Sequence, residues 1–134
     1  MAEYVPEGFQ RITPYLIIEE ADGFIAFAQA AFGAQPRMLH RRPDGRLMHG
    51  ELDMLGAVIE LGTPTGDYTP TRVALHVYVP DPDAVYAQAL AAGAKALYPP
   101  TDHDYGERSG GVEDAWGNQW YIAQVIDAQR RQRP

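Results

Sequence analysis

An α+β fold built from two βαβββ modules is predicted by an internal repeat in the chain. Four pairs of aspartate or glycine residues recur at one fixed offset of 61 positions, without a gap. These pairs are Asp22 with Asp83, Gly45 with Gly106, Asp53 with Asp114, and Gly56 with Gly117. A fixed internal period is the sequence signature of a duplicated structural unit. In both copies an apolar run is followed by an alanine-rich segment and then by short apolar segments, which is the order expected of an α+β protein.

The first copy shows the composition of a strand followed by the spacing of a helix. Residues 12–18 are mostly apolar or β-branched, with Pro14 near their start, where a strand tolerates proline. Apolar side chains then recur at helical spacing over residues 21–32, with Asp22 as the expected N-cap and Gly33 as the expected C-terminal cap. Three further strands are predicted over residues 37–42, 47–54 and 57–61.

The predicted strand 47–54 alternates between apolar and polar side chains. Because successive side chains of a strand point to opposite faces, two faces can be assigned. The apolar face is expected to carry Met48, Leu52 and Met54 and to pack on the helix. The polar face is expected to carry His49, Glu51 and Asp53.

The second copy repeats this order of elements. Its predicted elements are a strand over 73–79, a helix over 83–92, and strands over 95–98, within 102–114 and over 119–125. The helices should cover one face of the sheet, because the apolar faces of the strands need a partner. The chain is therefore expected to be one domain, 1–134, with module 1 at about residues 8–62, a linker over 63–71, module 2 at about 72–126, and a basic tail over 127–134 that frays.

Composition and charge exclude several classes of protein. The chain has 134 residues, of which 46% are hydrophobic and 22% charged, as in globular domains. Its net charge of −7 argues against binding to nucleic acid, which needs a basic surface. It has no cysteine, so histidines and carboxylates would have to hold any metal.

Neither a membrane span nor a secretory signal is predicted. The chain has no apolar run of about 18 residues, the least that could span a bilayer. Its first residues lack the basic start and apolar core of a signal peptide. We therefore expect no membrane partner and a location in the cytoplasm.

Three segments carry a resemblance to a known family. They are residues 57–61 (Ala-Val-Ile-Glu-Leu), residues 105–111 (Tyr-Gly-Glu-Arg-Ser-Gly-Gly) and residues 114–121 (Asp-Ala-Trp-Gly-Asn-Gln-Trp-Tyr). With the repeated βαβββ order, the chain resembles the vicinal oxygen chelate superfamily over about residues 8–126. That superfamily holds glyoxalase I, bleomycin-resistance proteins, fosfomycin-resistance enzymes and extradiol dioxygenases, and this chain is most similar to a glyoxalase-like branch whose members mostly lack an assigned reaction. The resemblance implies a curved eight-stranded sheet around a cavity, helices on the outer face, and a homodimer.

The resemblance also locates the positions at which family enzymes hold a metal ion. One ligand lies on the first and last strand of each module, and these positions correspond here to Thr13, Glu60, Ala74 and Tyr121. A divalent ion needs about three or four nitrogen and oxygen donors. Because only Glu60 is a good ligand, the usual metal quartet is not expected, and no cofactor is predicted.

A displaced site remains as an alternative. His49, Glu51, Asp53, Glu60, His76 and Tyr121 are expected to converge on one cavity. The two histidines and two glutamates, His49, Glu51, Glu60 and His76, could bind a divalent metal or act as acid and base. They could equally be a solvated strand face and a structural histidine. Arg108 is a further candidate, because its guanidinium could pair with a carboxylate of a ligand.

The predicted function is the binding of a small organic molecule in a concave cavity, without the family's usual metal. An acidic lining would suit a cationic ligand. The alternative is a lyase or isomerase with a non-standard histidine and glutamate site. An interaction role for the sheet is a third hypothesis.

Overall fold

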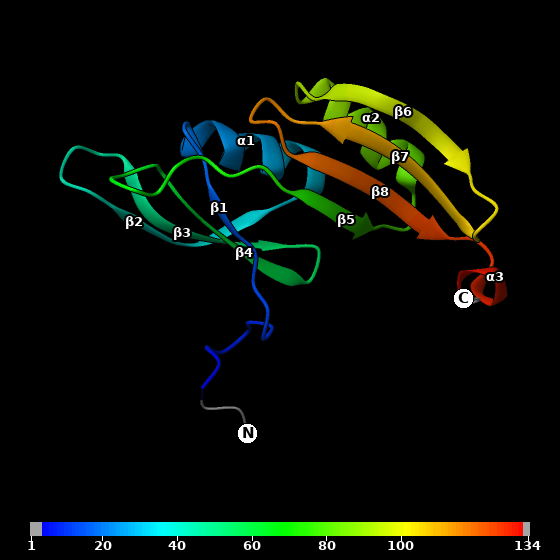
Figure 1. The fold of residues 1–134 in the computed structure, drawn as a ribbon, viewed down its shortest axis with the longest axis horizontal. Helices are drawn as coiled ribbons and strands as arrows, with labels where there is room; N and C mark the ends of the chain where they lie inside the picture. The colour runs from blue at the N-terminus through cyan, green and yellow to red at the C-terminus, as the bar shows by residue number, and fades with distance from the viewer. Residues whose placement is uncertain (1–3, 133–134) are drawn as a thin grey trace. The chain divides into compact units, whose positions relative to one another are not determined.

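The computed structural model of the protein describes residues 4–132 and confirms the α+β class (Figure 1). The chain divides into two compact units. One comprises the residues up to Gln29 and residues 33–71, and the other comprises residues 30–32 and those from Arg72 onward. Each unit is built around one module of the repeat.

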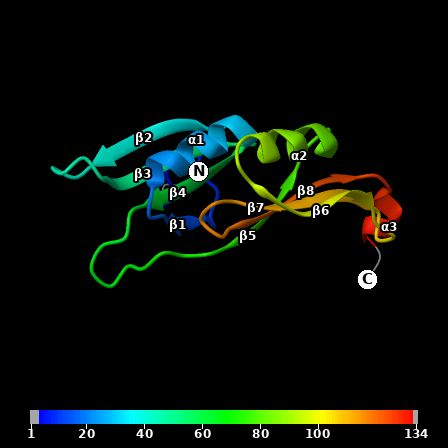
Figure 2. The ribbon, with the colours of Figure 1, turned by 90° about the horizontal axis from the view of Figure 1, so that it is seen from above.

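The first module forms a four-stranded sheet in the order β1-β4-β3-β2. Its elements are β1 (Tyr15–Ile17), α1 (Ala21–Phe32), β2 (Gln35–Arg41), β3 (Leu47–Met54) and β4 (Ala57–Gly62). The β1 and β4 strands are parallel, and the other neighbours are antiparallel. Figure 2 shows α1 over the strands of this sheet.

The second module repeats the topology in the order β5-β8-β7-β6. Its elements are β5 (Ala74–Tyr78), α2 (Pro82–Ala91), β6 (Lys95–Asp102), β7 (Glu107–Glu113) and β8 (Gln119–Val125). Again the first and last strands are parallel, and α2 covers one face (Figure 2). The eight strands expected in one curved sheet thus form two hydrogen-bonded sheets of four.

An arginine holds the first turn of each helix to its sheet, but the two modules place it differently. In the first module, Arg41 at the end of β2 donates two hydrogen bonds to the carboxylate of Asp22. In the second, Asp83, the repeat mate of Asp22, pairs with Arg108 of β7. Asp102 stands at the repeat position of Arg41 and also pairs with Arg108. Both modules therefore pair the helix aspartate with an arginine, but the arginine lies on β2 in the first module and on β7 in the second.

The ends of α1 agree only partly with the sequence prediction. Gly33 ends the helix in the left-handed region, with φ of 71°, as expected. The N-cap prediction for Asp22 was wrong, because Glu20 holds that position and makes no side-chain cap. The Asp22 carboxylate instead accepts two hydrogen bonds from Arg41, and such a bidentate charged pair is stronger than a hydrogen bond to a backbone N–H of the helix.

A β-bulge makes the observed alternation at the start of β3 differ from the predicted one. The register between β2 and β3 shifts between His40 and Arg41, which lie opposite the start of β3. As a result Leu47 is buried at 1% exposure, whereas Met48 is 49% exposed. The expectation that Met48 packs under the helix was therefore wrong, since an inserted residue reverses the faces of a strand.

The turn before β8 is organised by the buried carboxylate of Asp114. It accepts hydrogen bonds from the backbone N–H of Trp116 and Asn118, from the Asn118 amide and from the Trp120 indole. The Asn118 side chain in turn accepts from the N–H of Val73, just before β5. Residues 114–121, which supported the family resemblance, therefore have a structural role, and Trp120 is fully buried.

The basic tail does not fray as predicted within the described residues. It forms a short helix, α3 (Ala128–Gln132), whose first turn is capped by Asp127. Arg131 of this helix donates a hydrogen bond to Glu107 at the start of β7. No helix in residues 4–132 combines the length and the apolar character needed to cross a bilayer.

Candidate functional site

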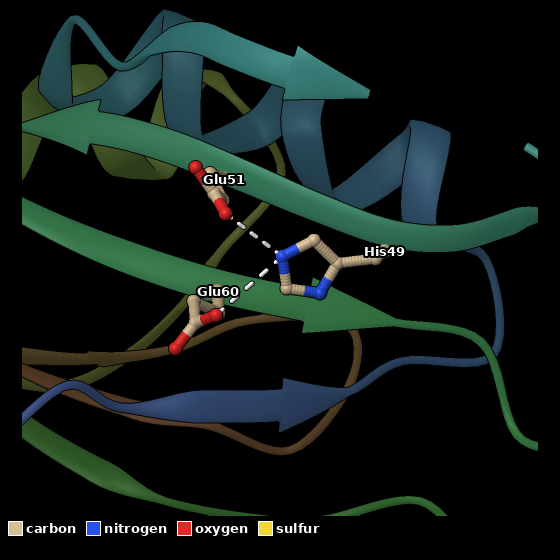
Figure 3. A group of neighbouring side chains, drawn as sticks. All are labelled: His49, Glu51 and Glu60. Atoms are coloured by element: carbon tan, nitrogen blue, oxygen red, sulfur yellow. Dashed lines mark hydrogen bonds and ion pairs between the residues drawn. The ribbon is translucent and has the colours of Figure 1, made fainter. Parts of the chain in front are cut away.

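Three ionisable side chains of the first module meet on the sheet face away from α1 (Figure 3). Glu51 of β3 and Glu60 of β4 are cross-strand neighbours. His49 lies two residues before Glu51, so it shares that face. Its Nε2 lies 2.9 Å from Glu51 Oε2 and 3.5 Å from Glu60 Oε1. The hairpin between β3 and β4 therefore sets the geometry of a His-Glu-Glu cluster.

The imidazole of His49 is placed between two carboxylates that would otherwise repel one another. Its other nitrogen, Nδ1, lies 3.3 Å from the hydroxyl of Tyr15 on β1. Burial, followed by the negative charge of Glu60, raises the pKa of Tyr15, so its phenol keeps its proton at neutral pH. A neutral His49 can then accept from Tyr15 at Nδ1 and donate from Nε2 to Glu51, which satisfies both ring nitrogens.

A cavity of about 950 Å³ opens beside this cluster, within the first unit. Its wall includes Tyr15, Ile17, Met48 and Tyr68, with the charged Arg42 and Asp44 at one side. The exposure of Met48 that the bulge creates thus supplies apolar surface to the cavity. This volume lies in the range of drug-sized ligand pockets.

A smaller cavity of about 350 Å³ reaches the carboxylates directly. Glu51 and Glu60 line it together with Arg11 and Thr13. Tyr15 stands between this cluster and the larger cavity, because it lines the latter while its hydroxyl meets His49. Glu51 and Glu60 therefore line the smaller, polar cavity, whereas the larger, apolar cavity meets the cluster through Tyr15.

The structure brings together only part of the predicted site. His49, Glu51 and Glu60 converge as expected. Asp53 does not join them, because its carboxylate pairs with Arg37 at 3.2 Å and is largely exposed. The sequence prediction also omitted Tyr15, which is the repeat mate of His76 and could have been found through that match.

His76 and Tyr121 belong to the second unit. The ring of His76 stacks on Tyr78 at 4.7 Å and meets the edge of Tyr121 at 6.2 Å. His76 Nε2 lies 3.2 Å from Oε1 of Glu107, a carboxylate that the sequence prediction missed. The repeat could not have indicated Glu107, because its mate in the first module is the exposed Arg46.

Arg108 pairs with carboxylates of the protein, and its pairing with a ligand carboxylate stays a prediction. Its guanidinium donates to both oxygens of Asp83, at 2.7 and 2.8 Å, and to Asp102 at 3.0 Å. These hydrogen bonds raise the pKa of Arg108 further above its ordinary value. Because its donors are engaged by protein carboxylates, Arg108 anchors α2 to the sheet.

The His-Glu-Glu cluster has a donor set that suits a divalent metal. One ligand atom from each of His49, Glu51 and Glu60 lies within 4.8 Å of the others, and this is the one such group among the described residues. One imidazole nitrogen and two carboxylate oxygens are common ligands of zinc, manganese and iron. With a metal at Nε2, the Nδ1 hydrogen of His49 could donate to Tyr15, the outer contact that orients histidine ligands.

The family's usual corner positions do not form such a set. Thr13 donates its hydroxyl to the carbonyl of Gln10, and the Tyr121 hydroxyl donates to Gln119 at 2.6 Å. Ala74 has no ligand atom in its side chain. The side chains of Thr13, Ala74 and Tyr121 therefore do not supply the donors of the family's metal quartet.

Comparisons with known proteins agree with the fold. The family model of the Glyoxalase/Bleomycin resistance protein/Dioxygenase superfamily matches residues 9–122. The uncharacterised protein Mb0911c of Mycobacterium bovis is 32% identical over 127 residues, covering 86% of this chain and 83% of the relative. TioX from Micromonospora sp. ML1 has a TM-score of 0.74 at 23% identity, covering 87% of this chain and 99% of TioX. A glyoxalase/bleomycin resistance protein/dioxygenase family enzyme from Burkholderia phytofirmans PsJN has a TM-score of 0.64 at 19% identity, covering 84% and 95%.

Proposed function

Since the chain belongs to the glyoxalase/bleomycin resistance protein/dioxygenase superfamily, we propose that it binds a small organic molecule in the larger cavity of its first module. The cavity of about 950 Å³ beside a His-Glu-Glu cluster carries this proposal. Tyr15, Met48 and Tyr68 offer apolar and aromatic surface to the body of the ligand. Such a wall with a few polar groups at one point is the usual composition of a ligand pocket.

The polar end of the ligand is proposed to be a cation. The cluster combines two carboxylates with one histidine, and Tyr15 connects it to the larger cavity. A protonated amine could donate hydrogen bonds to Glu51 or Glu60 and pack against the ring of Tyr15. The net charge of −7 would favour its approach.

Calorimetry with matched ligands tests this proposal. Aromatic amines, their neutral alcohol analogues and their carboxylate analogues are titrated into the protein. We expect the amines to bind best, and Glu60→Gln to weaken them about 10-fold, the effect of losing about 1.4 kcal/mol. Glu113→Gln in the second module is the control, because Glu113 makes only a distant 3.9 Å pair with Lys95. The proposal fails if no amine binds at millimolar concentration, or if both variants bind equally well.

A second candidate function is that of a metal-dependent lyase or isomerase. The donor atoms of His49, Glu51 and Glu60 favour it, because they already lie within 4.8 Å of one another. These three residues would hold the ion, and a bound divalent metal would supply Lewis-acid polarisation of a substrate oxygen. Glu51 and Glu60 would then serve as ligands and be unavailable to a cationic amine.

Metal binding separates the two candidates. Elemental analysis of the purified protein and titration with zinc, manganese and nickel would measure it, with His49→Ala as the disrupted variant and Asp53→Asn as the control. A stoichiometric ion that His49→Ala loses and Asp53→Asn keeps would support the metal candidate. Absence of binding at micromolar concentration would eliminate it and leave the amine proposal standing.

Assembly and location remain predictions. We propose a homodimer, for which light scattering should give about twice the 14.8 kDa mass of the chain. A monomer at micromolar concentration would contradict it. We propose the cytoplasm as the location, and the acidic composition argues against a nucleic-acid partner.

A further inference from the structure

The second module contains a buried carboxylate that has no role in the proposal for the first. Glu107 of β7 is 1% exposed. Its Oε2 accepts hydrogen bonds from the hydroxyl of Tyr78, at 2.8 Å, and from Nε of Arg131. Its Oε1 has no hydrogen-bond partner among the described residues, although Nε2 of His76 approaches to 3.2 Å in unsuitable geometry. The carboxylate is therefore only half satisfied.

Glu107 is an anion at neutral pH. Burial raises the pKa of its carboxyl group, but the hydrogen bonds from Tyr78 and Arg131 and the nearby charge of His76 outweigh burial, so the net shift is downward. A buried anion is costly unless a cation accompanies it. The site is thus built to hold a positive charge against Oε2.

The chain supplies that charge from a short helix that is held by polar contacts. Arg131 belongs to α3, a helix of five residues, none of them buried. Its side chain is 49% exposed, and the neighbouring Arg130 donates a hydrogen bond to the carbonyl of Asp104. Just before the helix, the backbone N–H groups of Ile126 and Asp127 donate to the carbonyl of Gly106. A terminal helix held by polar contacts alone opens at small cost, because little apolar surface is buried beneath it.

The surroundings of Glu107 have the chemistry that recognises organic cations. The ring of His76 stacks on Tyr78 with an interplanar angle of 13° and lies edge-on to Tyr121. His76 and Tyr78 come from β5 and Tyr121 from β8, and β8 lies between β5 and β7 in the same sheet. Aromatic faces beside a carboxylate favour guanidinium and ammonium groups.

We propose that Glu107, Tyr78 and His76 form a second ligand site, which takes the guanidinium or ammonium group of a small organic molecule. Arg131 is its tethered occupant when no ligand is present. The ligand replaces Arg131 at Oε2 and releases α3. This site lies wholly in the second module and is independent of the function proposed for the first.

The test compares free guanidinium binding in the full chain and in Arg131→Ala. Methylguanidinium is titrated at constant ionic strength, and binding is followed by amide chemical shifts of residues 76–78 and 107 and by thermal unfolding. A tethered occupant acts as a competitor at millimolar effective concentration. We therefore expect the apparent dissociation constant to fall about 10-fold when Arg131 is removed. Methylguanidinium should also restore part of the lost thermal stability, in a saturable manner.

Three variants and one probe complete the test. Arg130→Ala should behave like the unaltered protein, because Arg130 does not contact Glu107. Arg131→Ala combined with Glu107→Gln should lose saturable binding of methylguanidinium. Tetramethylammonium, which cannot donate hydrogen bonds, should show no saturable binding to Arg131→Ala. If Glu107→Gln does not fold, Tyr78→Phe with Arg131→Ala should still weaken binding. A folded Arg131→Ala that shows no saturable response would overturn the proposal and leave Arg131–Glu107 as a structural ion pair.

Discussion

Asp53 and Asp114 are repeat mates, and replacing each by asparagine should have very different effects on stability. Asp53 is exposed and makes one ion pair, with Arg37. Asp114 is buried, and its Oδ2 alone accepts hydrogen bonds from the Asn118 amide and the Trp120 indole. The same change at equivalent positions of the repeat therefore tests how much the buried network contributes.

The expected loss for Asp114→Asn follows from the donors left without an acceptor. An asparagine can keep one oxygen toward the backbone N–H groups of Trp116 and Asn118, but its amide nitrogen then faces the other two donors. Each buried donor without a partner costs about 1–3 kcal/mol, so the free energy of unfolding should fall by about 2–6 kcal/mol. For Asp53→Asn the expected loss is about 0–1 kcal/mol, the usual value of a surface ion pair.

Urea unfolding followed by tryptophan fluorescence measures both variants, since Trp116 and Trp120 report on the turn itself. Against a total stability of about 5–15 kcal/mol, the loss in Asp114→Asn would be easily resolved. Equal losses in the two variants, or a loss below about 1 kcal/mol in Asp114→Asn, would refute the reasoning. A loss confined to Asp53→Asn would show that the buried network contributes nothing.

Three further predictions concern the two sites. Gly62→Ala should destabilise the protein by about 1–3 kcal/mol in urea unfolding, because the new methyl would lie 2.7 Å from the Met48 carbonyl oxygen and 3.1 Å from the Tyr15 hydroxyl; unchanged stability would contradict the close approach. Tyr15 should ionise above the usual value of about 10 in an NMR titration, and Glu60→Gln should lower its pKa. Since the folded state holds this proton more tightly, the contribution of Tyr15 to stability should fall as pH rises above about 10. An ordinary Tyr15 pKa would count against its placement beside His49 and Glu60. The pKa of Glu107 lies below its usual value of about 4.3, so its contribution to stability should be present above that pH and be lost as pH falls through the folded-state pKa. Glu107→Gln should therefore flatten the acid side of the curve of stability against pH, and an unchanged acid side would contradict this.

Most of the fold could be predicted from the sequence, because its signals are local. The repeat and the alternation of side chains predicted β3 and β8 with the bounds that the structure has, at Leu47–Met54 and Gln119–Val125. The errors arose where distant contacts overruled local pattern. A register shift against β2 exposed Met48, and Arg41 took the carboxylate of Asp22 away from the helix end. Contact with Glu107 ordered the basic tail.

The candidate site divides in the same way. The sequence by itself determined that His49, Glu51 and Glu60 share one face, because alternation and a short hairpin place them there. Only the tertiary structure decided that Tyr15 joins them and that a cavity lies beside them, since β1 pairs with β4 across 45 positions of the chain. Only the tertiary structure likewise shows the partners of Glu107. They come from β5 and α3, and neither periodicity nor the repeat carries information about contacts between elements so far apart.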